Sequence, residues 1–277
     1  MNFLILPALF LVLFAQVFSQ NKDLEKLVET ENLFAKTAAL NGQNAAFIEF
    51  LANDGIIFRP DAKNGKEFFR NSPESSDFLS WQTVFADISA NNAIGYTTGD
   101  WQFSTKKGEN PSAFGQFVSI WQKQQNGEFK VVLDIGVSHE KPQNVETKLT
   151  FPTSSPASKN ETPTKFSAFL TAESVYDRSQ FVSMFENIYK KHFADDVRVL
   201  REGKLPIIGK KIALSVLKKE VLLKHFPKLK LGFGIQDLAY TFGTYDSPTD
   251  KGNFVEIWKF RKGKWQIVLN ILSPIKN

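Results

Sequence analysis

An internal repeat is the feature that most constrains the fold of this chain. Residues 117–135 contain the runs FVSIW and FKVVLDI around a polar turn with a glycine, and residues 254–271 contain FVEIW and WQIVLNI around a similar turn. Shorter matches recur upstream in the same order: YTTG and YTFG at residues 96–99 and 240–243, AND and ADD at 52–54 and 194–196, and GK at 65–66 and 209–210. Matches that keep one order along the chain indicate a duplicated domain.

The segment between the two copies sets their boundaries. Residues 142–164 are rich in Pro, Ser and Thr, a composition that resists both helix and strand. We therefore expect a first domain over residues 21–141, a linker over residues 142–164 and a second domain over residues 165–277. Within the linker, we expect residues 149–151 to pair briefly with a neighbouring sheet.

Residues 1–20 are expected to be a secretory signal peptide. Residues 3–14 are almost unbroken hydrocarbon, and small or modest side chains precede an expected cleavage site near Ser19 or Gln20. An uncleaved anchor is the alternative, but the run is shorter than the roughly 20 residues that a spanning helix needs. We therefore expect a periplasmic or secreted protein that has no membrane contact after cleavage. Because the chain has no cysteine, packing alone must hold its domains together.

Each copy is expected to begin with helices and to end with strands. In the first copy, apolar spacing predicts helices over residues 24–38, 44–51 and 65–71, and strands over residues 55–60, 80–88, 93–104, 112–123 and 128–137. In the second copy it predicts helices over residues 167–176, 178–193 and 210–225. Helices followed by a run of antiparallel strands predict an α+β fold.

The last two strands of each copy are apolar on both faces. A sheet needs this pattern when helices cover one face and a further layer covers the other. We expect the further layer to be the other copy, so that the two domains form an internal pseudo-dimer. The alternative is two separate domains that each pair with another chain, as in a homodimer.

Three runs of the first copy carry a family resemblance: YTTGDW at residues 96–101, FVSIWQK at 117–123 and FKVVLDIG at 129–136. They resemble the SnoaL-like, domain-of-unknown-function branch of the nuclear transport factor 2-like superfamily, over nearly all of residues 21–141 and more loosely over 165–277. The resemblance implies a cone, in which a curved antiparallel sheet wraps around N-terminal helices and leaves a pocket at its open end. It also implies dimers through the convex sheet face. The superfamily includes ketosteroid isomerase, polyketide cyclases, dehydratases and non-catalytic binding domains, so the fold alone does not give the function.

The resemblance to ketosteroid isomerase places an arginine where that family has its general base. Arg59 stands just before Pro60 in the first copy, and Arg201 takes the equivalent position in the second. A guanidinium stays protonated at ordinary pH and cannot accept a substrate proton. Pointing into the cones, the two arginines would suit a carboxylate or phosphate group. The alternative is a surface arginine that bridges Asp61 or Glu202.

Asp134 lies inside the apolar last strand of the first copy, and Asn270 takes its place in the second. Because a buried carboxylate is costly unless it is paired, Asp134 is a candidate pocket acid with a raised pKa. The alternatives are an exposed or interface aspartate, or a partner for Arg59. The candidate aromatic walls of the two cones are Trp81, Tyr96, Trp101 and Trp121, with Tyr240 and Trp258 in the second copy; plain core is the alternative.

Composition removes several classes of function. The net charge of +5 is spread along the chain, whereas nucleic-acid binding needs a concentrated basic stripe. The three histidines are scattered without ligand spacing, so we expect neither a metal nor another cofactor. The leading hypothesis is an exported, non-catalytic protein that binds a small amphipathic or anionic ligand. The alternatives are a cofactor-free isomerase, cyclase or dehydratase that uses Asp134, and a structural or protein-interaction module with filled cones.

Overall fold

The fold is seen in a computed structural model that describes residues 21–144, 147–152, 165–172, 189–217, 228–246 and 250–275. The expected signal peptide lies outside these residues, as do most of the linker and most of the helix predicted over residues 178–193. The last parts of the helices predicted over residues 167–176 and 210–225 also lie outside them. None of the helices in the described part has the length and apolarity to cross a membrane.

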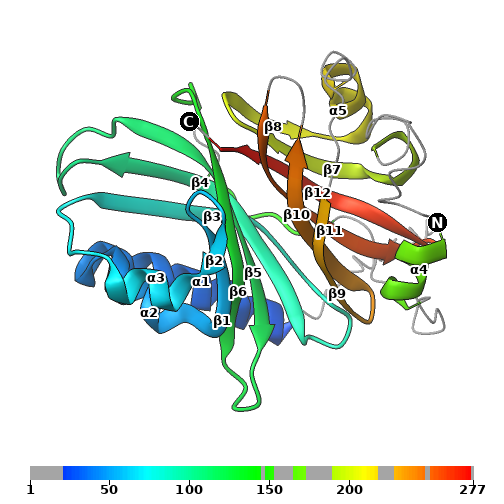
Figure 1. The fold of residues 1–277 in the computed structure, drawn as a ribbon, viewed down its shortest axis with the longest axis horizontal. Helices are drawn as coiled ribbons and strands as arrows, with labels where there is room; N and C mark the ends of the chain where they lie inside the picture. The colour runs from blue at the N-terminus through cyan, green and yellow to red at the C-terminus, as the bar shows by residue number, and fades with distance from the viewer. Residues whose placement is uncertain are drawn as a thin grey trace, which may run out of the picture.

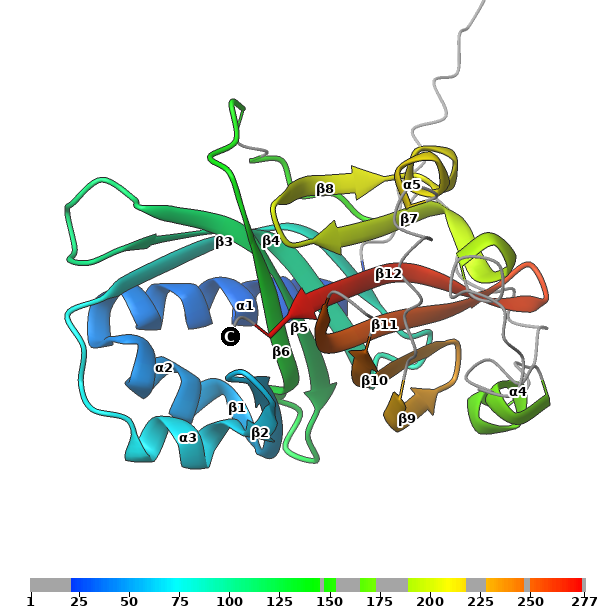
Figure 2. The same cartoon turned by 45° about the horizontal axis from the view of Figure 1, so that its top comes forward.

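The helices of the first domain are α1 (Lys22–Asn41), α2 (Gln43–Phe50) and α3 (Gly65–Asn71). Helix α1 begins where the Asn21 side chain accepts hydrogen bonds from the N–H groups of Asp23 and Leu24, which is a normal N-cap. It ends at Gly42, whose φ of 89° suits a residue without a side chain. The predicted apolar stripe of α1 faces the sheet, so this helix forms the layer that covers the concave face (Figure 2).

The first sheet contains β1 (Leu51–Phe58), β2 (Ala62–Asn64), β3 (Phe78–Ile88), β4 (Ile94–Ser104), β5 (Ala113–Lys123) and β6 (Phe129–His139). Its strand order is β2-β1-β6-β5-β4-β3 (Figure 1). The long strands agree closely with those predicted, but the short strand β2 was not predicted. The sheet is also mixed, because β1 pairs with β6 in parallel, with Ile57 opposite Asp134.

The second domain repeats this plan. It contains α4 (Phe166–Ala172), β7 (Phe193–Arg201), β8 (Lys204–Ile208), α5 (Lys210–Leu217), β9 (Lys228–Ile235), β10 (Leu238–Asp246), β11 (Lys251–Arg261) and β12 (Lys264–Pro274). The strand order β8-β7-β12-β11-β10-β9 matches that of the first sheet element for element. The predicted α+β fold in two tandem copies is therefore confirmed. The predicted pairing within residues 149–151 is also confirmed, because Thr150 bridges to Phe85 at the β3 edge.

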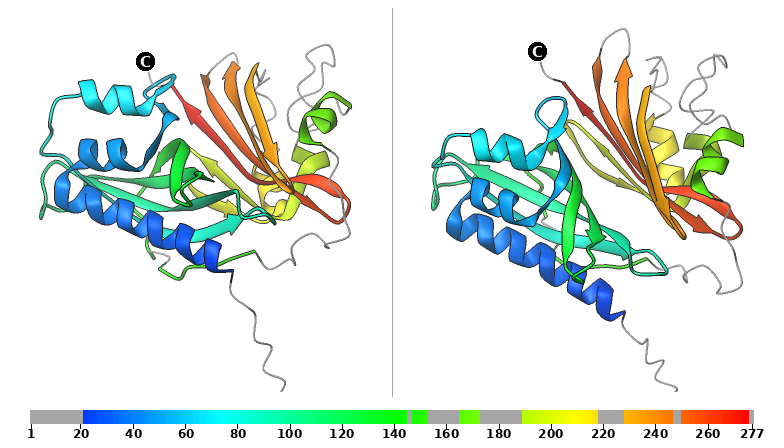
Figure 3. Two further views of the ribbon diagram at one scale, coloured as in Figure 1. Left: turned by 90° about the horizontal axis from the view of Figure 1, so that it is seen from below. Right: turned by 60° about the horizontal axis from the view of Figure 1, so that its bottom comes forward.

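The outer faces of the two sheets pack against each other (Figure 3). One buried apolar cluster takes residues from both domains, including Tyr96 and Ile120 from the first sheet and Tyr240 and Ile257 from the second. The rings of Phe58 and Phe242 meet across this interface with centroids 6.0 Å apart. The interface is thus a continuous hydrophobic core between two sheets, as in a β-sandwich.

A buried ion network crosses the same interface. The Lys259 ammonium lies 3.4 Å from Asp87 Oδ1 and 3.3 Å from Asp237 Oδ2, and it donates to the carbonyl oxygen of Ile88 at 2.7 Å. Arg261 Nη2 lies 3.6 Å from the other oxygen of Asp87. All four charged residues are less than 9% exposed, so their charges are stabilised by one another, by backbone N–H groups that donate to Asp87 and Asp237, and by Asp196, which pairs with Arg261 at 2.9 Å.

Candidate ligand-binding site

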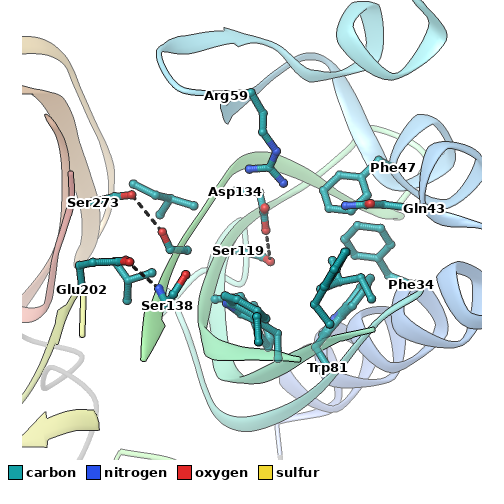
Figure 4. A pocket seen from close by; sticks show the side chains of 18 of the residues that line it. Phe34, Gln43, Phe47, Arg59, Trp81, Ser119, Asp134, Ser138, Glu202 and Ser273 are labelled. Atoms are coloured by element: carbon teal, nitrogen blue, oxygen red, sulfur yellow. Dashed lines mark hydrogen bonds between the residues drawn. The ribbon is translucent and has the colours of Figure 1, made fainter. Parts of the chain in front are cut away.

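A cavity of about 460 Å³ opens between the first sheet and its helices (Figure 4). Its size is within the range of pockets that hold small molecules. Helices α1 and α2 contribute Phe34, Gln43 and Phe47, and the sheet contributes most of the rest. The second domain also reaches the cavity, through Glu202, Ser273 and Pro274.

Aromatic rings form the inner wall of the cavity. The Phe34 ring lies with its centroid 4.8 Å from that of Phe47 and 4.9 Å from that of Trp81, in edge-to-face contacts. Phe117 stands beside Trp81, at 6.4 Å between centroids. Edge-to-face contacts fix the rings against one another, so this wall is an apolar surface of defined shape.

Two glycines make room for the Trp101 indole on the concave face. A Cβ atom on Gly115 would lie 2.3 Å from Trp101 Cζ2, and one on Gly136 would lie 3.4 Å from Trp101 Nε1. The indole therefore lies across the backbone of β5 and β6, where its N–H donates to the carbonyl oxygen of Gln116 at 3.1 Å. Held by this hydrogen bond, the Trp101 indole lines the cavity.

The polar groups of the cavity include Arg59, Asp134 and Ser119, and the other polar residues that line it are Gln43, Ser138, Glu202 and Ser273. Arg59 follows the last residue of β1 and is exposed at the mouth, and Figure 4 shows its guanidinium turned toward Asp134. Nη1 of Arg59 donates to the carbonyl oxygen of Phe58 at 2.9 Å, and Arg59 makes no ion pair within the described part of the chain. The Ser119 hydroxyl donates to Asp134 Oδ2 at 2.9 Å. Burial raises the pKa of Asp134 to about 6, although Arg59 and Ser119 act to lower it.

A second carboxyl group, Glu31, lies behind the aromatic wall and is fully buried. Its Oε1 accepts from Trp81 Nε1 at 2.7 Å, and its Oε2 accepts from Thr97 Oγ1 at 2.6 Å and from Trp121 Nε1 at 3.1 Å. Burial raises the pKa of Glu31 to about 7 against these hydrogen bonds, and the nearby charge of Asp134 raises it further. Sequence reasoning gave Glu31 no role. The available signal was an acid inside the apolar stripe of α1.

The raised pKa of Glu31 predicts a pH-dependent stability. Its ordinary value is 4.5, so between about pH 4.5 and 7 the folded state keeps a proton that the unfolded state releases. Stability from this group is therefore complete below pH 4.5 and falls as pH rises to 7. We expect urea unfolding to show that the wild type loses about 3 kcal/mol relative to Glu31→Gln between pH 5 and 8. Equal losses in the two proteins would contradict the assignment.

The structure brings four of the candidate residues to one cavity, which is lined by Arg59, Trp81, Trp101 and Asp134. Two other candidates of the first domain do not line it. Tyr96 points to the outer face of the sheet and lies in the core between the domains, 1% exposed. Trp121 points to the concave face but is fully buried, because Glu31 and Thr97 hold its indole N–H. Their prediction as pocket walls was wrong.

Within the part of the second domain that the structure describes, its candidate residues are buried and none of them lines the cavity of the first domain. Tyr240 lies in the core between the domains, and Trp258 is fully buried against Phe166 and Phe169. The Arg201 guanidinium is buried and donates to the carbonyl oxygens of Leu200 and Asn270 and to the Tyr189 hydroxyl. The pocket roles of Tyr240, Trp258 and Arg201 therefore remain a prediction.

Larger side chains take two of the equivalent positions in the described part of the second domain. Leu272 stands two residues after Asn270, where Gly136 stands two residues after Asp134, and it packs on Tyr245 and Phe254. Glu256 replaces Ser119 and is fully buried, accepting from Asn270 Nδ2 at 3.0 Å. Both replacements put more side-chain volume on the inner face of the second sheet than the first sheet has there.

The two domains keep one polar pair and give it different acids. In the first domain Trp121 Nε1 donates to Thr97 Oγ1 at 3.0 Å, and in the second Trp258 Nε1 donates to Thr241 Oγ1 at 3.1 Å. The carboxylate beside the first pair is that of Glu31, from helix α1. The carboxylate beside the second pair comes from strand β11 itself, where Glu256 Oε2 lies 3.5 Å from Thr241 Oγ1.

The fold and the pocket define a tandem of two cone-shaped α+β domains, of which the first is hollow. No protein-family model matches the chain, and no curated protein matches it. In the described residues, no group of three or more His, Cys, Asp and Glu side chains could hold a metal ion.

Solved structures of single domains do match. A putative ketosteroid isomerase from Parabacteroides distasonis is 11% identical with a TM-score of 0.34, and the match covers 45% of this chain and 93% of that one. A ketosteroid isomerase-like protein from Erwinia carotovora atroseptica is 15% identical with a TM-score of 0.35, covering 44% and 99%. An NTF2-like protein from Cytophaga hutchinsonii is 11% identical with a TM-score of 0.31, covering 40% and 99%. These are structures of the kind that the sequence resembles, and at such scores they carry no argument about function.

Proposed function

We propose that the first domain binds a small amphipathic molecule with an anionic group. The observation that carries the proposal is the open cavity of about 460 Å³, with an aromatic inner wall and an arginine at its mouth. The apolar part of the ligand would lie against Phe34, Phe47 and Trp81, and its anionic group would meet the Arg59 guanidinium. A planar fork of N–H donors suits a carboxylate, phosphate or sulfonate group.

The charge of Asp134 bears on this arrangement. When ionised, Asp134 offsets part of the charge of Arg59 and repels an anion at the mouth. When protonated, it leaves Arg59 uncompensated and can donate a hydrogen bond to the ligand. Because the pKa of Asp134 is about 6, anionic ligands should bind more tightly at pH 5 than at pH 8.

Arg59→Ala tests the proposal with two related probes. The anionic 1-anilinonaphthalene-8-sulfonate and the neutral N-phenyl-1-naphthylamine share their aromatic body and differ by the sulfonate group. We expect Arg59→Ala to weaken the anionic probe about tenfold, the effect of losing one charged hydrogen bond, and to change the neutral probe little. Fluorescence titration measures both affinities.

The control for this substitution is Arg70→Ala, on the exposed side of α3, which should leave both affinities unchanged. Equal weakening of the two probes by Arg59→Ala would mean that the arginine supports the pocket without meeting an anion. Failure of wild-type protein to bind either probe would remove the proposal.

The second candidate function is acid–base catalysis by Asp134. One observation favours it: a carboxyl group with a pKa near 6 faces a cavity, hydrogen-bonded only to Ser119 among the described residues. Such a group is ionised at neutral pH and basic enough to remove an acidic proton next to a carbonyl. NMR of deuterium exchange into acetylacetone reports this activity, which should rise through pH 6 and be lost in Asp134→Asn.

We also propose that the protein is exported. The support is the apolar run over residues 3–14, followed by the expected cleavage site near Ser19 or Gln20. Mass spectrometry of the protein purified from a secreting host should give an N-terminus at residue 20 or 21. An intact N-terminus would contradict this proposal.

A further inference from the structure

The side of the first domain that faces the second has an open strand edge beside the cavity. Strand β1 is paired with β6 only as far as Ile57 opposite Asp134, and β1 ends at Phe58 while β6 continues to His139. Beyond Asp134, the backbone of β6 therefore has no partner strand on that side among the described residues. This separation of β1 from β6 makes the mouth of the cavity.

The second domain satisfies the backbone groups along the open edge. Glu202 Oε2 accepts from the N–H of Ser138 at 2.8 Å, and the N–H of Gly203 donates to the Ser138 carbonyl oxygen at 2.8 Å. The Ser273 hydroxyl donates to the Gly136 carbonyl oxygen at 3.0 Å. Figure 4 shows Glu202 and Ser273 reaching β6 from the second domain, on the side away from the aromatic wall.

The second domain also contacts the other side of the mouth, which is the β1–β2 turn. Asn253 Nδ2, on β11, donates to the Pro60 carbonyl oxygen at 2.7 Å, one residue beyond Arg59. Both views in Figure 3 show the end of β12 running up to the β1–β2 turn. The second domain thus contacts both β6 and the β1–β2 turn, which are the two strand segments that border the mouth.

We propose that the second domain acts as a wall of the first domain's pocket, with Glu202, Asn253 and Ser273 as positioning residues that set the width of its mouth. The inference rests on the proposed function for the meaning of the pocket, but its geometry stands apart from any ligand. The inference gives the duplicated domain a role in shaping the pocket. The second copy supplies the surface against which the mouth of the first copy is held.

The test measures the width of the mouth without a ligand. Because the chain has no cysteine, spin labels can be placed on Asp61→Cys in the β1–β2 turn and Glu140→Cys after β6, both at exposed positions. Electron–electron double resonance should give one narrow distance distribution in the otherwise native protein. The distribution should broaden in the combined variant with Glu202→Ala, Asn253→Ala and Ser273→Ala.

Single substitutions keep the test decisive if the combined variant does not fold. Ser273→Ala should broaden the distance distribution. Ser273→Thr should keep it narrow, because threonine keeps the hydroxyl. The matched control is Ser215→Ala in α5. An unchanged distribution in a folded Ser273→Ala or combined variant overturns the inference.

A second measurement separates this inference from the proposed function. In the unlabelled variants, each lost hydrogen bond should weaken the anionic naphthalene probe by about fivefold. If the wild type does not bind the probe, the proposed function fails and the spin-label distances still decide the inference. If the wild type binds and all variants bind equally, the positioning role is wrong.

Discussion

Replacing Glu31 with alanine is expected to lower the free energy of unfolding by about 4 kcal/mol, measured by urea unfolding at pH 7. The reason is that three buried donors share this carboxyl group: the indoles of Trp81 and Trp121 and the hydroxyl of Thr97. Removing the acceptor leaves the Trp81 indole and the Thr97 hydroxyl without it, leaves the Trp121 indole with Thr97 Oγ1 alone, and opens a cavity between α1 and the sheet.

Two variants separate the hydrogen bonds from the volume. Glu31→Gln keeps the shape and one carbonyl acceptor, so it should lose less than Glu31→Ala. Glu29→Ala removes an exposed acid of the same helix and should change stability by less than about 0.5 kcal/mol. A loss below 1 kcal/mol in Glu31→Ala would show that water or another acceptor takes the place of the carboxyl group.

Lys259→Met is expected to cost about 4 kcal/mol, because it breaks a buried ion network while leaving the carboxylates in place. Asp87 and Asp237 would lose the ammonium that lies 3.4 Å and 3.3 Å from them, and both residues are less than 7% exposed. Methionine has a similar length, so packing between the sheets should be largely kept.

The matched control is Lys264→Met, an exposed lysine at the start of β12, whose effect should be small. If the variant were as stable as wild type at pH 7, solvent must reach these carboxylates at the interface.

The architecture could be predicted from the sequence because the repeat and the apolar spacing are two separate indications of the same helices and strands. Two copies of one pattern gave the helices and long strands of the first domain closely. The missed strands, β2 and β8, are short edge strands of 3 and 5 residues, too short for a periodicity to be seen. The parallel pairing of β1 with β6 was missed because periodicity gives the faces of a strand but not its neighbours.

The pocket residues were predicted in part, and strand geometry explains the errors. Tyr96 and Trp101 are five residues apart in one strand, so they point to opposite faces, and only Trp101 faces the cavity. Leu272 occupies in the second domain the position that Gly136 has in the first. This difference adds side-chain volume on the inner face of the second sheet, although it looks minor in a repeat alignment. The contributions of Glu202 and Ser273 could not be seen, because they depend on how the domains dock.

The two buried acids, Glu31 and Glu256, come from different elements, and this affects the order in which the two halves fold during synthesis. In the second domain, Glu256 is part of the sheet, so the Thr241–Trp258 pair finds its acid as soon as β10 and β11 pair. In the first domain the acid arrives from α1, which leaves the ribosome first and must wait for β3, β4 and β5. The N-terminal half therefore completes its buried hydrogen bonds only after α1 meets strands that are far away in the sequence. The C-terminal sheet already contains the acid that it needs.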